Sequence, residues 1–228
     1  MPKTIVIIGA SRGIGKAMVE LFANVETNKV IALARNHHRM NAVFGNYDNV
    51  ECYHLDLNKT NVREQCDEIF DSLNSIDILI NNAGILVNKP FTELTREDLE
   101  MCYNVNVIGV MQSTQAAVSK MRKAHIVNIS SVGGFQGSVK FPGLSAYSTS
   151  KAALCSFTEL FAEEYKESEI TMNCLCLGAV QTEMLQEAFP GYEAPISAEK
   201  MAEFIVNFAL TADQWMKGKI IPVSLSTP

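Results

Sequence analysis

The sequence predicts a doubly wound α/β fold, in which a seven-stranded parallel sheet is flanked by helices on both faces. Short runs of apolar and β-branched residues alternate with helical patterns along most of the 228 residues. Such alternation is typical of right-handed βαβ units that build one parallel sheet. Several of the runs, among them Ile5–Ile8, are apolar almost throughout. A parallel strand that is covered on both faces has this composition.

Seven segments carry the strand pattern and five carry the helical pattern. We expect strands at Thr4–Ile8, Lys29–Ala34, Val50–Leu55, Ile76–Ile80, His125–Ser130, Thr171–Leu177 and Lys219–Val223. We expect helices near residues 14–24, 60–73, 94–122, 145–168 and 198–210. Turn-forming and capping residues separate these segments, and His37 and His38 are interpreted as part of a polar loop. Because no linker, repeat or low-complexity stretch interrupts the pattern, a single domain is predicted over residues 1–228.

The composition is that of a soluble, mildly acidic, globular chain. Its 19 Lys and Arg residues are outnumbered by 25 Asp and Glu residues, which gives a formal net charge of -6. Nucleic-acid-binding proteins need basic patches, so this balance argues against a nucleic-acid partner. No apolar run approaches the roughly 18 residues that a transmembrane helix needs, so we expect no membrane partner. The six cysteines form no C-x-x-C pair, which favours free core thiols in a reducing cytoplasm.

A glycine-rich turn follows the first predicted strand and opens a helix. Ligands of doubly wound sheets bind at the carboxyl ends of the strands, and glycines there let the backbone approach a diphosphate. A P-loop is the rival interpretation, but five residues separate Gly9 from Gly15, and Ala17 stands where that motif needs a hydroxyl. The spacing also differs from G-x-G-x-x-G. The residues expected to contact a dinucleotide here are Gly9, Ser11, Arg12, Gly13, Ile14 and Gly15.

The end of the second strand favours NADP(H) over NAD(H). About 20 residues beyond the glycines, an NAD site carries an acid for the ribose 2′-hydroxyl. This chain instead has Arg35 and Asn36, and Arg12 adds a second guanidinium from the glycine turn. Two guanidinium groups suit a 2′-phosphate. The alternative is that both arginines are solvated surface side chains.

Tyr147 and Lys151 form a candidate acid–base pair. They are four residues apart at the start of a predicted helix, so they share one helical face. A nearby ammonium is expected to lower the phenol pKa and make the phenol an acid–base group. Ser148 and Lys151 also match the S-x-x-K of serine acyl-transfer enzymes, but the companion motifs S-D-N and K-T-G are absent. None of the four histidines stands in H-E-x-x-H, so a zinc hydrolase is unsupported.

Further motifs follow the strands in a recognisable order. They are Asp56-Leu57, Asn81-Asn82-Ala83-Gly84, Asn106, Ser130-Ser131, and Tyr147 with Lys151. Together with the glycine turn, they resemble the motifs of the short-chain dehydrogenase/reductase superfamily over essentially the whole chain. The resemblance implies a Rossmann-type fold and an NADP(H)-dependent oxidoreductase. It also implies cofactor contacts from Asp56, Leu57, Asn82, Ala83 and Gly84.

The resemblance assigns a role to each of four residues. Tyr147 would protonate a carbonyl oxygen as hydride arrives, or deprotonate an alcohol in the reverse direction. Lys151 would hold the nicotinamide ribose, and Asn106 would anchor a water in a proton relay. Ser131 would hydrogen-bond the reacting oxygen. We choose it over Ser130 because family members place this serine next to the following Val/Gly segment.

One position departs from the family pattern. After the sixth strand the family usually has Asn-x-x-x-Pro-Gly, whereas Leu177 replaces the proline here. Gly178, Val180 and Thr182 still match, and the resemblance implies that they meet the nicotinamide carboxamide and the phosphates. Without proline the turn gains an N–H and a free φ angle, so we expect a looser turn and a changed cofactor fit.

The substrate and the assembly are less well defined by the sequence. Residues 183–196 match the family's substrate lid and are short here, which suggests a shallow, mainly apolar pocket for a carbonyl or alcohol. The expected pocket residues are Phe135, Phe141, Leu144, Met184 and Leu185. Lys140 and Lys89 are candidates to bind an anionic substrate group. The final strand lacks the family's Gly-Gly, so we expect a homodimer rather than a tetramer. A cofactor-binding sensor or scaffold with vestigial catalysis is the alternative function.

Overall fold

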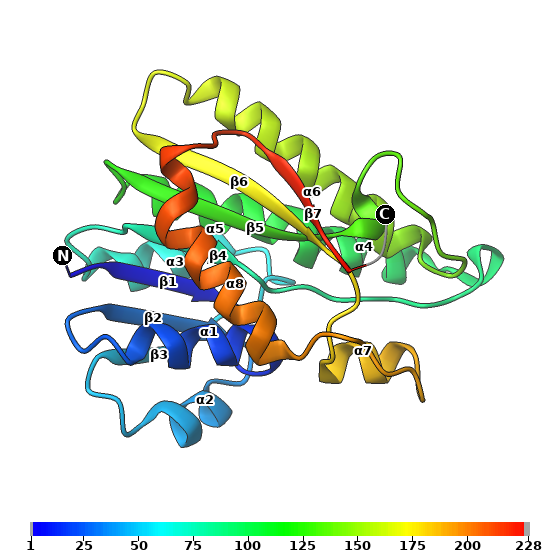
Figure 1. The fold of residues 1–228 in the computed structure, drawn as a ribbon, viewed down its shortest axis with the longest axis horizontal. Helices are drawn as coiled ribbons and strands as arrows, with labels where there is room; N and C mark the ends of the chain where they lie inside the picture. Colours follow the sequence, from blue (N-terminus) through cyan, green and yellow to red (C-terminus); the bar gives the residue numbers. More distant parts are fainter. Residues whose placement is uncertain (1, 226–228) are drawn as a thin grey trace.

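The computed structural model describes residues 2–225, in which one twisted sheet lies between two layers of helices (Figure 1). The seven strands run parallel in the order β3-β2-β1-β4-β5-β6-β7. They are β1 (Thr4–Ile8), β2 (Lys29–Ala34), β3 (Val50–His54), β4 (Ile78–Asn81), β5 (Ala124–Ser131), β6 (Ile170–Leu177) and β7 (Ile220–Val223). The chain adds β2 and β3 on one side of β1, and then returns to add β4 to β7 on the other side. This reversal of strand order between β1 and β4 confirms the doubly wound fold.

Helices cover both faces of the sheet. They are α1 (Gly13–Ala23), α2 (His37–Phe44), α3 (Val62–Asp71), α4 (Arg96–Tyr103), α5 (Gly109–Val118), α6 (Ser145–Glu164), α7 (Glu183–Ala188) and α8 (Ala198–Thr211). α1, α2 and α8 pack on one face, against Ile5 and Ile7 of β1. α3, α5 and α6 pack on the other face, against Val6 and Ile8. The period of two in a strand therefore divides the apolar residues of β1 between two cores.

The interpretation of His37 and His38 as a polar loop is wrong, because they begin α2. The Asn36 side chain accepts a hydrogen bond from the backbone N–H of Arg39 at 3.0 Å, which caps the helix. Met40 and Phe44 are fully buried and attach the helix to the sheet. Two buried apolar residues four positions apart are a weak signal beside five polar or small neighbours, so the pattern alone did not show this helix.

The long helix expected at residues 94–122 is divided. α4 and α5 are joined by a π-helical turn, Asn104–Ile108. Such turns are frequent at functional sites because the extra residue changes the direction in which side chains leave the helix. Here the turn carries Asn106, whose side chain is completely buried.

A buried amide network joins the central strands to the helices. Asn81 of β4 donates to the Asn128 side-chain oxygen of β5 at 2.8 Å and to the Thr114 hydroxyl of α5 at 3.2 Å. Asn128 in turn donates to the Thr158 hydroxyl of α6 at 2.9 Å. Polar groups this deep in a core stabilise only when they are paired, so these bonds define how the helices sit on the strands.

The glycine turn after β1 is packed directly against the chain that follows β4. Gly9 has a φ of +91°, and a Cβ on it would lie 2.6 Å from the backbone of Ala83. The Asn82 side chain donates to the Gly9 carbonyl oxygen at 2.9 Å. A Cβ on Gly15 would lie only 1.9 Å from that same oxygen. The turn therefore has no room for any side chain at either glycine.

Replacing Gly9 with alanine is expected to destabilise the fold by roughly 3 kcal/mol or more, since a left-handed φ and a backbone clash act together. Gly137→Ala is the matched control, because Gly137 has a φ of +82° but nothing within 4 Å of the added Cβ. It should lose only about 1–2 kcal/mol. Urea unfolding of both variants measures the difference, and equal losses would show that the close packing of the turn is unimportant.

Candidate active site

A cavity of about 650 Å³ lies at the carboxyl ends of the strands. Its wall is formed by the segments that follow β1 to β6, together with α7, which lies beyond these strand ends (Figure 1). The residues expected to bind a cofactor line it, except Gly15, which is buried in the turn. Asp56 and Leu57 after β3 and Gly178, Val180 and Thr182 after β6 are all in the wall. The strand-end motifs are therefore brought together.

The first part of the cavity fits the diphosphate of a dinucleotide. Gly9 and Gly13 present bare backbone to the cavity, and α1 begins there with no acidic residue in its first turn. A helix N-terminus with free N–H groups and a partial positive charge favours an anion. Because Gly9 and Gly15 exclude side chains, the backbone rather than a side chain forms this surface.

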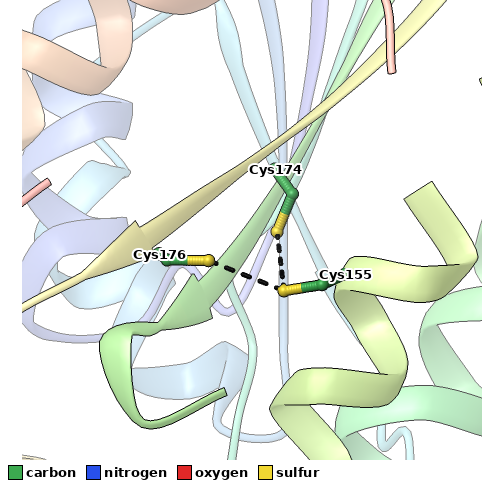
Figure 2. Close-up of side chains that lie close together, drawn as sticks. All are labelled: Cys155, Cys174 and Cys176. Atoms are coloured by element: carbon green, nitrogen blue, oxygen red, sulfur yellow. Dashed lines mark hydrogen bonds between the residues drawn. The ribbon is translucent and has the colours of Figure 1, made fainter. Parts of the chain in front are cut away.

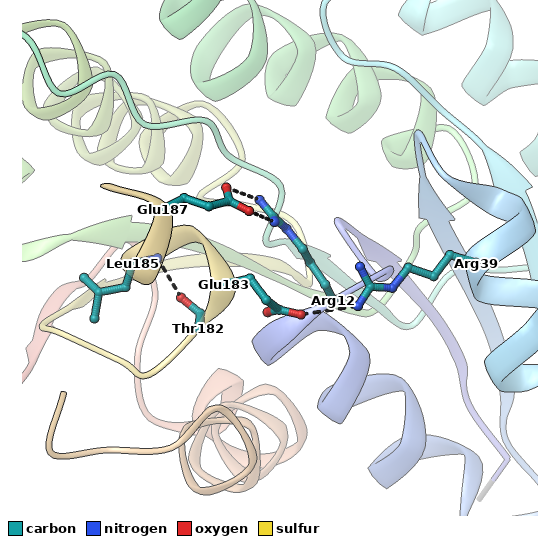
Figure 3. Close-up of polar contacts among 6 residues, drawn as sticks. All are labelled: Arg12, Arg39, Thr182, Glu183, Leu185 and Glu187. Carbon is teal, nitrogen blue, oxygen red and sulfur yellow. Dashed lines mark hydrogen bonds and ion pairs between the residues drawn. The ribbon is translucent and has the colours of Figure 1, made fainter. Parts of the chain in front are cut away.

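Arginines on this side of the cavity are bound by acids of α7 (Figure 3). Arg12 pairs with Glu187 through its two terminal guanidinium nitrogens, at 2.5 and 3.2 Å. Arg39 of α2 pairs with Glu183 at 3.3 Å. The hydrogen bond from Arg12 holds the pKa of the exposed Glu187 carboxyl below its usual value. Arg35 is exposed and also lines the cavity.

Arg39 is a cavity residue that the sequence analysis missed. It lies in the first turn of α2, whereas Arg35 precedes the helix and its N-cap residue Asn36. The sequence pattern did not show α2, so it gave no reason to place Arg39 beside the end of β2. The structure therefore offers three guanidinium groups around one end of the cavity rather than two.

Tyr147 and Lys151 project from the first turns of α6 into the other part of the cavity. The Lys151 Nζ lies 6.0 Å from the centre of the Tyr147 ring and donates to the Ile129 carbonyl oxygen at 2.8 Å. Burial lowers the pKa of Lys151 to about 8. Burial also raises the pKa of Tyr147, and its hydrogen bond with Ser131 offsets this only in part.

The expectation that Lys151 lowers the Tyr147 pKa is therefore wrong for the protein without ligands. Removal from water disfavours both the phenolate and the ammonium, so each group is pushed towards its neutral form. The ammonium is also directed at a backbone carbonyl rather than at the phenol oxygen. Spacing along a helix showed that the two residues are neighbours but not which electrostatic effect dominates.

The two serines at the end of β5 point in different directions. The Ser130 hydroxyl is buried and donates to the Lys151 carbonyl oxygen at 2.8 Å. The Ser131 hydroxyl accepts from the Gly133 N–H at 3.2 Å and interacts with Tyr147. This arrangement supports the choice of Ser131 as the serine beside the reacting group.

Asn106 lies behind the cavity rather than in its wall. Its amide oxygen accepts from the Ile85 N–H at 2.8 Å, and its nitrogen donates to the Ile85 carbonyl at 2.9 Å and to the Ser150 hydroxyl at 2.9 Å. Gly84 separates it from Lys151, because a Cβ on Gly84 would lie 3.2 Å from the Lys151 Nζ and 3.4 Å from the Asn106 oxygen. Asn106 therefore supports the chain that carries Gly84.

Four of the five expected substrate-pocket residues line the cavity, namely Phe141, Leu144, Met184 and Leu185. Phe135 does not, and its assignment to the pocket is wrong. It packs instead against Cys155, Cys174 and Cys176 beneath the loop. Phe189 and Tyr192 of the expected lid segment complete the apolar wall.

Neither candidate lysine is free to bind an anionic substrate group. Lys140 donates to the carbonyl oxygens of Gly133 and Phe135 at 3.1 and 2.6 Å. Lys89 pairs with Asp98 at 2.6 Å. Leu177 is the last residue of β6, paired in register with both neighbouring strands.

Comparison with known proteins identifies the family. The family model described as short chain dehydrogenase matches residues 3–193. The chain is 31% identical to a 3-oxoacyl-acyl-carrier-protein reductase of Aquifex aeolicus, covering 97% of this chain and 96% of that protein. The chain belongs to the short-chain dehydrogenase family. It is also 34% identical to an L-2,3-butanediol dehydrogenase of Corynebacterium glutamicum, over 82% of this chain and 75% of that one.

Solved structures of this family superpose over nearly the whole chain. A short-chain dehydrogenase of Burkholderia cenocepacia in complex with NADP is 25% identical, with a TM-score of 0.85 over 97% of this chain and 96% of that one. ElxO with NADP bound is 26% identical, with a TM-score of 0.84 over 98% of each chain. The protein is therefore an oxidoreductase of the short-chain dehydrogenase family. Within residues 2–225, none of its helices is long and apolar enough to cross a bilayer.

The lowered Lys151 pKa has a consequence for stability. Between pH 8 and 10.5 the unfolded chain holds a proton on this lysine that the folded chain has released, so the lysine makes stability rise with pH across this window. Lys151→Met removes this contribution. The measured quantity is the free energy of unfolding of the variant minus that of the parent. It should be larger at pH 7 than at pH 10, by up to about 3 kcal/mol.

Urea unfolding of both proteins at the two pH values measures this difference. Constant effects of the substitution, such as the lost bond to Ile129, cancel in the comparison. The control is Lys200→Met, which makes the same substitution at an exposed position. A parent–variant difference that is the same at pH 7 and pH 10 would contradict the lowered pKa.

Proposed function

We propose that this protein is an NADP(H)-dependent carbonyl reductase that uses Tyr147 as its general acid. The observation that carries the proposal is the position of the Tyr147 phenol, in the cavity wall beside the Ser131 hydroxyl and one helical turn from Lys151. The bound nicotinamide would supply the hydride. The Ser131 hydroxyl would hydrogen-bond the carbonyl oxygen, and Tyr147 would transfer its proton to that oxygen.

The raised Tyr147 pKa keeps the phenol protonated at neutral pH. The protonated phenol is the form that reduction of a carbonyl requires. The reverse reaction, oxidation of an alcohol, needs the phenolate and should therefore be favoured at high pH. Lys151 would hold the nicotinamide ribose through its ammonium.

Three arginines support NADP(H) rather than NAD(H). Arg12, Arg35 and Arg39 line the end of the cavity next to β2, where no acidic residue follows the strand. Guanidinium groups form charge-assisted, bidentate bonds with phosphate. Glu187 and Glu183 hold two of them, so a 2′-phosphate would replace carboxylates that already mark this place as an anion site. Two relatives of known structure were solved with NADP.

The substrate is proposed to be an uncharged carbonyl: a ketone, an aldehyde or the 3-oxo group of an acyl thioester. Phe141, Leu144, Met184 and Leu185 form an apolar wall, and the two nearby lysines are engaged elsewhere. The relatives named 3-oxoacyl reductase and butanediol dehydrogenase act on oxygen functions of this kind.

We also propose a homodimer in the cytoplasm. Large apolar side chains are exposed on α4, α5 and α6, including Leu99 (41% exposed), Met111 (38%) and Leu160 (67%). A second copy could cover them without using the end of β7. The six cysteines are all free thiols, as a reducing compartment requires.

Tyr147→Phe should lower turnover by about 10²–10⁴-fold, because it removes the proton donor. The measurement is NADPH oxidation with a panel of ketones, aldehydes and 3-oxoacyl thioesters, together with NADPH binding followed by fluorescence. Binding should persist in the variant. Tyr165→Phe is the control, since Tyr165 lies at the other end of α6 and stacks on Phe161.

Unchanged turnover in Tyr147→Phe would refute the mechanism. Binding of NADPH by the parent with no accepted carbonyl would favour a sensor.

Arg35→Asp should lower the ratio of kcat/KM for NADPH to that for NADH by about 10- to 100-fold, as expected for a lost charge-assisted hydrogen bond and an added repulsion. Arg122→Asp makes the same charge change at an exposed position outside the cavity and is the control. An unaltered ratio in Arg35→Asp would contradict the assignment of the 2′-phosphate site.

A further inference from the structure

Three cysteine thiols meet behind the catalytic wall. Cys155 lies on α6, and Cys174 and Cys176 lie two residues apart on the face of β6 that meets this helix. The Cys155 sulfur is 3.5 Å from the Cys176 sulfur and 4.0 Å from the Cys174 sulfur (Figure 2). All three sulfur atoms lie within 4.8 Å of one another. Among residues 2–225 they are the only group of three or more His, Cys, Asp or Glu side chains with this geometry.

The thiol cluster is buried among apolar side chains with one buried ammonium nearby. Cys174 and Cys176 are completely buried and Cys155 is 9% exposed. Phe135 and Ile220 pack against the cluster, and Lys151 interacts electrostatically with all three thiols. The Ser130 hydroxyl is 3.5 Å from the Cys155 sulfur and already donates to the Lys151 carbonyl oxygen. The cluster therefore offers three sulfur ligands.

The sulfur separations suit one ion bound by three thiolates. With metal–sulfur bonds of about 2.3 Å, three sulfur atoms around one centre lie about 4 Å apart. The observed separations of 3.5 and 4.0 Å need only small side-chain rotations to reach this arrangement. Thiolates bind soft ions preferentially. The hard ions calcium, magnesium and manganese should therefore bind poorly at this site.

The number of ligands decides between the soft ions. Structural Zn²⁺ sites hold the ion with four ligands, and this cluster offers three sulfur atoms. A trivalent ion such as arsenic(III) forms three bonds, so three thiolates satisfy it completely. We propose that Cys155, Cys174 and Cys176 form a binding site for a trivalent thiophilic ion, of which arsenic(III) is the test case.

The binding reaction needs no oxidant. Arsenous acid, As(OH)₃, is uncharged at neutral pH and can enter an apolar site. Each thiol gives its proton to one hydroxide of arsenous acid, and three As–O bonds are replaced by three As–S bonds. Three waters leave, arsenic stays trivalent, and the cysteines are not oxidised. The reaction is independent of the proposed carbonyl reduction.

The test measures arsenic retained by the whole reduced chain. The protein is treated with a phosphine reductant, incubated with sodium arsenite, and passed through gel filtration in excess monothiol, which removes arsenic from isolated cysteines. We expect one arsenic per chain by elemental analysis, and a native mass that increases by one arsenic atom less three hydrogens. A parallel incubation with zinc chloride should leave no zinc bound.

Cys174→Ala and Cys176→Ala remove one ligand each and should lower arsenic affinity by at least about tenfold. Loss of a group that merely supports a metal ligand already lowers metal affinity by about this much. Cys66→Ala is the control, because Cys66 is a buried thiol on α3 outside the cluster. Circular dichroism checks that each variant is folded, and Cys174→Val and Cys176→Val replace any alanine variant that is not.

Three results would overturn the proposal. One is equal arsenic retention in the cluster variants and the parent. Another is no retention by the parent, both when arsenite is added to the folded chain and when the chain is refolded in its presence, because refolding removes any barrier to entry. The third is retention of zinc in place of arsenic, which would contradict the argument from the number of ligands.

Discussion

The close contact between the glycine turn after β1 and the chain after β4 is the constraint on which the cavity depends. The Gly9 carbonyl oxygen accepts from Asn82 and lies against Gly15, so β1, α1 and β4 meet with backbone directly on backbone. Because no side chain intervenes, the N-terminus of α1 faces the strand ends. Arg12 leaves this turn from an extended conformation and reaches across the cavity to α7. The anion end of the cavity is therefore an outcome of packing as much as of charge.

Burial governs the chemistry at the other end. Lys151 and Tyr147 are neighbours, yet removal from water shifts each of them towards its neutral form. A neutral phenol is the form that can give a proton to a carbonyl. Asn106 and Ser130 act on backbone, at Ile85 and at the Lys151 carbonyl, and so hold the chain that carries Gly84 and Lys151. The groups proposed to be catalytic and the structural polar groups thus form adjacent layers.

The sequence predicted the strands and the residues that follow them, because buried parallel strands are apolar throughout and their ends are polar. It did not predict α2, which has only Met40 and Phe44 as fully buried residues, and so it missed Arg39. The Phe135 ring packs beneath its loop against Cys155, Cys174 and Cys176 rather than lining the cavity. The sequence could not show this contact, because the three small cysteines come from other elements of the fold. The sign of the Tyr147 pKa shift was also beyond reach, since it depends on solvation in the assembled wall.

The ion pairs between α7 and the arginines bear on how fast an anionic cofactor is captured. Long-range attraction depends on unbalanced positive charge around an entrance. Here Glu187 and Glu183 balance Arg12 and Arg39 before any ligand arrives, and the chain as a whole carries a charge of -6. The entrance therefore offers little electrostatic steering, and the association rate should vary only weakly with ionic strength. With the proposed NADP(H), affinity would then arise after contact, from the exchange of carboxylate for phosphate, and would be expressed in a slow dissociation rate.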